Sequence, residues 1–207
     1  AHNQSVYFLW VGPVSVMINS ISHTKSSGWI NLDAWSETYI GAYWLVRNEL
    51  PAYQYQADVH HGPLSQMVLL ASHQLVEIIF FQCVRSIFEN NPGNFLKIEK
   101  SYSRASFGRA LEEWPEILTG VPLDLTKEPL NSVCRLKNRR NATVHKNSAL
   151  TSLEMARSAL FSAVEASKLI AEHFMGDNGF KYESVLKKYP LQKEQWFGQV
   201  QFIDEVT

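Results

Sequence analysis

The chain has 207 residues, of which 45% are hydrophobic and 19% are charged, and its formal net charge at pH 7 is −1. This composition is ordinary for a globular protein that buries a sizeable core. Because the two signs of charge nearly cancel, the chain as a whole is not a polycation for nucleic acid, and any such binding must come from a local patch.

The first predicted element is an N-terminal helical segment that extends to about residue 22. Its apolar run, residues 6–18, is interrupted by Gly12 and Pro13, and it lacks the basic start and the cleavage site of a secretory signal. We therefore expect this run to belong to the core and not to span a membrane.

Two helices are predicted next along the chain. The first covers residues 33–49, with Asp33 as its N-cap. The second covers residues 64–89 and follows Pro63, because proline is favoured in the first turn of a helix. This second helix is apolar on more than one side, so we expect it at the centre of the fold.

Three further helices are predicted from caps and breakers in the second half of the chain. In chain order, the signals are Ser106 with a break near Pro115, Asn131 or Ser132 as the next N-cap, and Thr151 or Ser152 with a stop at Gly176. Residues 176–207 are more polar and are expected to pack on the bundle as a C-terminal arm. No run demands a sheet, so the predicted fold is all-α: a single antiparallel helical bundle over residues 1–207.

The chain contains two cysteines, Cys83 and Cys134, each in a predicted helix and without the spacing of metal ligands. This pattern argues against a zinc site and against a disulfide framework, and it fits a reducing cytoplasm. No glycine-rich phosphate loop, nucleophile elbow or paired-carboxylate motif is present. We therefore expect no metal and no cofactor.

Positive charge is concentrated in one predicted helix. Between Glu128 and Glu154 the chain has no acidic residue, whereas it carries five basic ones, namely Arg135, Lys137, Arg139, Arg140 and Lys146. Such a patch can bind the phosphates of RNA or of a nucleotide, even on a nearly neutral protein.

The position of Arg140 within this helix needs an explanation. At 100° per residue it shares a face with Val133, Leu136 and Val144, and a guanidinium on an apolar stripe must be paired, reach water or face a partner. An ideal helix separates Arg140 from His145 by roughly 140° and ~7.5 Å. The two side chains can therefore converge only if the long arginine reaches across or if the helix frays after Val144.

The stretch RLKNRRNATVHKNSALTSLEMARSALFSAVEASKLI resembles the signature half of a HEPN domain. The motif of that family is an arginine, often followed by a polar residue such as asparagine, with four to six residues in all before a histidine. Arg140, Asn141 and His145 match this motif best. Arg139 also satisfies the spacing, so the motif arginine remains open between the two.

The resemblance is good over about residues 130–175 and general over residues 64–89, and it implies a HEPN-like domain with its core at residues 64–175. HEPN domains are commonly homodimers in which the two motifs face one cleft, and in catalytic members this cleft is a metal-independent endoribonuclease of toxin or defence type. Carried onto this chain, His145 would move a proton, Arg140 would stabilise the charge of the transition state, and Asn141 would position the histidine or the phosphate. Arg135, Arg139, Lys137 and Lys146 would bind RNA.

Two plainer interpretations stand beside this one. The cations can be a solvated face that complements the helix dipole, and the domain can be a non-catalytic module that binds a partner such as an antitoxin or a regulatory protein. His73 and Glu77 lie four residues apart on the long central helix. They are candidates for a second wall of the cleft or, equally, for a buried hydrogen bond that holds helices together.

Overall fold

The computed structural model describes residues 33–49, 63–102, 105–146 and 151–202. These residues are mostly helical and include no strand, which confirms the all-α class. The predicted N-terminal helical segment lies outside the described residues.

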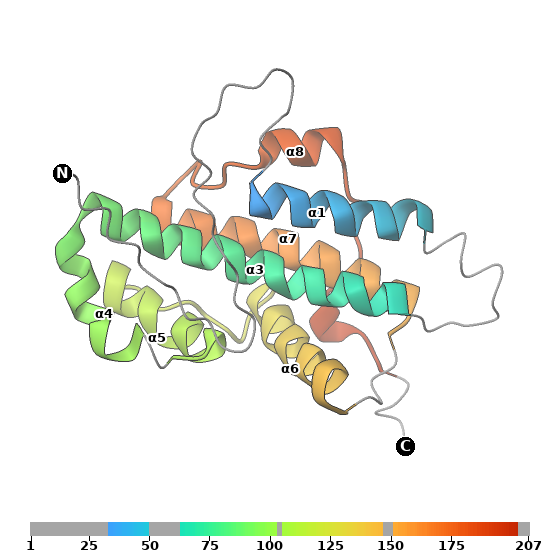
Figure 1. The fold of residues 1–207 in the computed structure, drawn as a ribbon, viewed down its shortest axis with the longest axis horizontal. Helices are drawn as coiled ribbons and strands as arrows, with labels where there is room; N and C mark the ends of the chain where they lie inside the picture. Colours follow the sequence, from blue (N-terminus) through green and yellow to red (C-terminus); the bar gives the residue numbers. More distant parts are fainter. Residues whose placement is uncertain (1–32, 50–62, 103–104, 147–150, 203–207) are drawn as a thin grey trace, which may run out of the picture.

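Two long helices, α3 (Pro63–Asn90) and α7 (Leu153–Met175), pack along each other and form the centre of the bundle (Figure 1). Helix α3 therefore takes the central position expected from its apolar sequence. By length and composition, Leu64–Asn90 is also the one stretch of the described chain apolar enough to cross a membrane, although 56% of its most apolar window is buried inside the bundle. In α7 a series of alanines without solvent exposure allows neighbouring helices to approach closely: Ala156, Ala159, Ala163, Ala166 and Ala171.

Helix α1 (Ala34–Trp44), which continues into a π-helical turn η1 (Leu45–Glu49), packs on α3 on the side opposite α4, α5 and α6 (Figure 1). The side chain of Asp33 accepts a hydrogen bond from the backbone N–H of Ser36 at 3.0 Å, so the predicted N-cap is confirmed. The buried Trp35 ring stacks on Tyr39 and Tyr182, and its Nε1 donates to Ser167 Oγ at 3.4 Å. These contacts join α1 to α7 and to the C-terminal arm.

The opposite side of the bundle contains the short turn η2 (Pro92–Asn94), α4 (Phe95–Tyr102), α5 (Phe107–Thr119) and α6 (Leu130–Lys146). Helix α4 is not among the helices predicted from the sequence. The expectation that the next helix breaks near Pro115 is wrong, because α5 continues to Thr119 and is followed by Gly120 in a left-handed conformation with φ of 82°. Pro115 cannot donate a backbone hydrogen bond within the helix, and burial of Trp114 and of the proline ring offsets the free-energy cost of that loss.

The first turn of α6 is capped by a residue that precedes it. Neither Asn131 nor Ser132 is the N-cap, as the sequence suggested, because both lie inside the helix. Instead, the carboxylate of Glu128 accepts from the backbone N–H of Ser132 at 3.1 Å and from its hydroxyl at 2.5 Å. The carboxylate therefore satisfies an N–H group that has no partner within the helix, and its charge is favourable at this end of the helix dipole.

Beyond α7 the chain returns across the bundle as the C-terminal arm (residues 176–202), which contains α8 (Glu183–Lys188) and η3 (Phe197–Gln199). Ser152 caps α7 by accepting from Met155 N–H at 3.2 Å, and Gly176 ends the helix, as predicted. The arm is anchored by buried apolar side chains, which are Phe180, Tyr182, Phe197, Val200 and Phe202. It is therefore an integral part of the core.

Candidate functional site

The face of α6 that is buried in the core differs from the face predicted from Val133, Leu136, Arg140 and Val144. Its buried residues include Ser132, Val133, Leu136 and Arg139, and Arg139 is only 6% exposed. Arg140, by contrast, is half-buried, and Val144 is 49% exposed. The expectation that Arg140 lies on the buried stripe is therefore wrong, and the buried arginine is its neighbour.

The arm explains how an arginine can be buried in this position. The guanidinium carbons of Arg135 and Arg139, one helical turn apart, lie 4.3 Å and 4.5 Å from the centre of the Phe202 ring. Arg135 Nη1 also donates to the carbonyl oxygen of Gly198 at 2.8 Å. Cation–π contact with a desolvated ring stabilises both charges, so these two predicted RNA-binding residues hold the arm on α6. A role for them in RNA binding stays a prediction.

Arg140 lies within electrostatic reach of α3. Its Nη1 donates to Asn141 Oδ1 at 3.0 Å, so the first two residues of the proposed motif are in direct contact. On α3, burial lowers the pKa of His73 and the charge of Arg140 adds to this shift, whereas burial raises the pKa of Glu77 and Arg140 opposes that shift. The structure thus brings Arg140 close enough to act electrostatically on the two residues suggested as a second wall.

On α3, the buried His73 and the partly buried Glu77 form a polar pair within reach of the charge of Arg140. His73 is 3% exposed, its Nδ1 lies 3.7 Å from Glu77 Oε1, and its ring packs edge-on against Phe107. The distance is too long for a hydrogen bond. Burial, helped by the charges of Arg140 and Lys137, lowers the pKa of His73 to about 4, so the imidazole is neutral at neutral pH and the pair is a polar contact and not an ion pair.

The Nε2 atom of the same imidazole is buried and has no hydrogen-bond partner within the described part of the chain. Burial raises the pKa of Glu77, while Arg140 opposes that shift. An unsatisfied ring nitrogen costs free energy, and it marks His73 as a group whose position is not explained by packing alone.

The C-terminal end of α6 carries the remaining motif residues. The helix continues through Lys146, so it does not fray after Val144, and the backbones of Arg140 and His145 keep helical spacing. The side chains of His145 and Lys146 lie outside what the structure describes. Convergence of Arg140 and His145 on one ligand therefore needs the reach of the arginine or a second copy of the chain.

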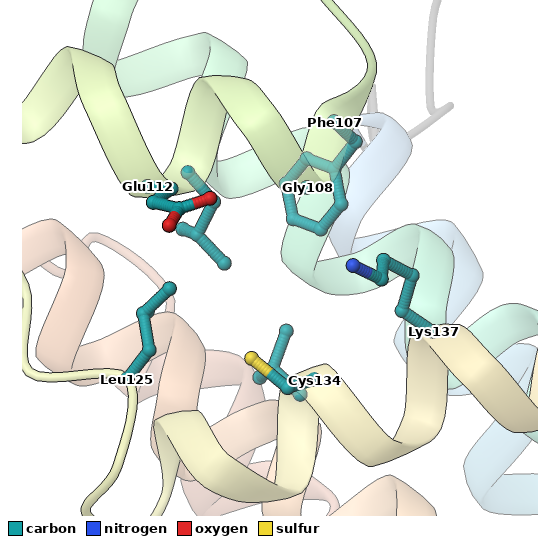
Figure 2. A pocket seen from close by; sticks show the side chains of 8 residues that line it. Phe107, Gly108, Glu112, Leu125, Cys134 and Lys137 are labelled. Carbon is teal, nitrogen blue, oxygen red and sulfur yellow. The ribbon is translucent and has the colours of Figure 1, made fainter.

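A separate pocket of about 220 Å³ lies between α5 and α6 (Figure 2). Lys137 extends from α6 along Gly108 of α5, while the carboxylate of Glu112 lies on another wall, as Figure 2 shows. The sulfur of Cys134 faces the same space, and burial raises the pKa of this thiol. This pocket has no signal in the sequence, because its walls come from two helices and a loop that meet only in the folded chain.

Metal binding has no support in the described ranges, where no three His, Cys, Asp or Glu residues gather at a possible metal site. Both cysteines are free: Cys83 is buried and Cys134 partly so. The adjacent residues His60 and His61 lie outside the described residues.

Comparison with known proteins gives no further guide to this site. No family model, no curated protein and no solved structure matches the chain. Inference about function therefore rests on the geometry of the chain's own residues and on the motif.

Proposed function

We propose that this protein is a HEPN-like, cytoplasmic RNA-binding protein that cleaves RNA without a metal ion, as a homodimer of toxin or defence type. Arg140 and His145 are the catalytic pair, and Asn141 positions one of them. The second wall of the cleft consists of His73 and Glu77.

The observation that carries the proposal is the different surroundings of the two candidate motif arginines. Arg139 is buried against Phe202, so its role is structural. Arg140 is half-buried, contacts Asn141 and acts electrostatically on His73 and Glu77. Of the two, only Arg140 combines partial access to solvent with a polar neighbourhood, which is what a group that binds a scissile phosphate requires.

The chemistry assigned to this site is attack of a ribose 2′-hydroxyl on the adjacent phosphate. His145 takes the proton from the hydroxyl or gives one to the leaving 5′-oxygen, and Arg140 stabilises the phosphorane-like transition state. The products carry a 2′,3′-cyclic phosphate on one side and a free 5′-hydroxyl on the other. Because α6 stays helical through His145, the histidine that serves a given arginine can come from the second protomer.

The test is cleavage of single-stranded RNA in the presence of EDTA. We expect the wild-type protein to produce ends with 2′,3′-cyclic phosphate, and we expect Arg140→Ala and His145→Ala each to lower the rate by roughly 10²-fold or more. Arg109→Ala on α5 is the matched control, since it removes an exposed cation that pairs only with Glu113 among the described residues. Equal cleavage by all four proteins would attribute the activity to a contaminating nuclease.

A second candidate function is a non-catalytic module of the same fold that binds RNA, a nucleotide, an antitoxin or a regulatory protein. The engagement of Arg135 and Arg139 with the arm favours it, because these cations hold the domain together instead of facing a substrate. RNA binding measured by fluorescence anisotropy, without any cleavage under the same conditions, would select this function over the first.

A further inference from the structure

The pocket between α5 and α6 is small, and its lining combines apolar and charged residues. Its volume of about 220 Å³ is below the ~300–1,000 Å³ typical of pockets for drug-sized ligands, so it suits only a small ligand. Much of its lining is apolar and comes from α5, α6 and the loop between them, namely Phe107, Leu111, Leu125 and Val133. A ligand held there must therefore be partly hydrocarbon.

One charged group of the pocket lacks a counterion. Lys137 is half-buried, and its ammonium group makes no hydrogen bond or ion pair with any part of the chain that the structure describes. A Cβ atom on Gly108 would lie 2.7 Å from Lys137 Nζ, so the ammonium occupies space that exists because residue 108 has no side chain. The lysine is thus held over the first turn of α5, where the helix dipole adds positive potential of its own.

A second charged residue of the pocket favours one class of anion over another. The carboxylate of Glu112 also lines the pocket, one helical turn from Gly108 along α5 (Figure 2). A phosphate dianion would meet this negative charge and would leave the apolar lining without a partner. A monovalent carboxylate attached to a short hydrocarbon chain can meet Lys137 at one end and cover the apolar residues with the other.

We propose that this pocket binds a small aliphatic carboxylate, with its oxygens on Lys137 Nζ and its hydrocarbon part over Leu111, Leu125 and Val133. The site is independent of RNA cleavage, and its ligand is recognised by one charge and by shape. It also assigns Lys137 to a ligand other than RNA.

The probe is 4-methylpentanoate, titrated into the full chain by isothermal calorimetry and compared with its neutral amide, 4-methylpentanamide. We expect saturable binding of one carboxylate per chain with a Kd of about 1 mM or tighter, and at least a tenfold weaker response to the amide. Lys137→Met keeps most of the length of the side chain without its charge and should also weaken binding at least tenfold. Gly108→Ala should weaken binding too, because the new methyl group displaces the ammonium.

The matched control is Lys127→Met, which removes an exposed lysine that pairs with Asp124 and should keep wild-type affinity. Circular dichroism establishes that each variant is folded. If Lys137→Met does not fold, the comparison of acid and amide on the wild-type protein decides.

Three results would overturn the proposal: no saturable binding of the carboxylate, equal binding of acid and amide, or displacement of the carboxylate by inorganic phosphate at the same concentration. Glu112→Gln should keep or strengthen binding. Loss of carboxylate binding in a folded Glu112→Gln variant would contradict the repulsion assigned to Glu112 and the proposed position of the ligand.

Discussion

At the scale of single residues, the two adjacent arginines of α6 show how one position along a helix separates structural from functional roles. Arg139 turns toward the core and stacks on Phe202, whereas Arg140 is half-buried and contacts Asn141. A rotation of 100° about the helix axis is sufficient for this difference. Substitution of the two should therefore have different effects on folding and on RNA cleavage.

Arg139→Ala is expected to lower the free energy of unfolding by about 1–3 kcal/mol, because it removes a buried side chain and its cation–π contact. Urea titration followed by circular dichroism measures this change. Arg85→Ala, which removes an exposed arginine paired with Glu89, is the control and should cost less than ~1 kcal/mol. A double-mutant cycle with Phe202→Leu should show that the losses at 139 and 202 are not additive. Additive losses would contradict the stacking contact.

His73 predicts a pH dependence of stability. Its pKa is lowered from 6.5 to about 4 in the fold, so between these values the unfolded chain binds a proton that the folded chain does not. The free energy of unfolding should therefore fall as pH decreases from 6.5 to 4, with a contribution from this histidine on the order of 3 kcal/mol. We expect His73→Leu to flatten the curve over this range, measured by urea titration at a series of pH values. An unchanged slope would show that other groups carry the dependence.

At the scale of elements, the start of α6 is held both by a residue just before the helix and by the distant C-terminal arm. Ser132 at its start donates to Glu128 and accepts from the backbone N–H of Gly198 in the arm at 2.8 Å. A Cβ atom on Gly198 would come within 2.8 Å of Asn131 Nδ2, so the arm can approach this closely only with glycine there. The arm and the start of the basic helix thus form one unit.

The N-cap of α7 offers a test of a single element. Ser152→Ala removes the hydroxyl that accepts from Met155 N–H, and it should lower the free energy of unfolding by about 1 kcal/mol. Thermal and urea unfolding measure the effect, and Ser152→Asp, which keeps an acceptor at the same position, should retain most of the stability. A loss with Asp as large as the loss with Ala would mean that the hydroxyl acts through packing and not as a cap.

At the scale of the whole molecule, the proposed activity depends on a second copy of the chain. If the site is shared between protomers, cleavage per chain should fall as the protein is diluted below the dissociation constant of the dimer, and light scattering should show the dimer at high concentration. Mixing Arg140→Ala with His145→Ala should recover part of the activity if each cleft takes its arginine and its histidine from different protomers. Constant activity per chain, with a monomer at every concentration, would contradict the shared site.

Much of the helical fold could be predicted from local signals, because Asp33, Ser152 and Gly176 act through contacts with their own helices. The burial of Arg139 could not be predicted from the sequence, because a core face is recognised by its apolar residues and arginine is not one of them. The ring that makes this burial possible lies in a distant segment, at Phe202. For the same reason, the pocket beside Lys137 and the nearness of Arg140 to His73 required the three-dimensional packing of three helices.

The dependence of α6 on Phe202 has a consequence for synthesis of the protein. A ribosome translates the basic helix long before it reaches the phenylalanine that covers Arg135 and Arg139. Until that ring emerges, the nascent chain must leave both cations in water, so this corner of the bundle is completed only after the arm has been made.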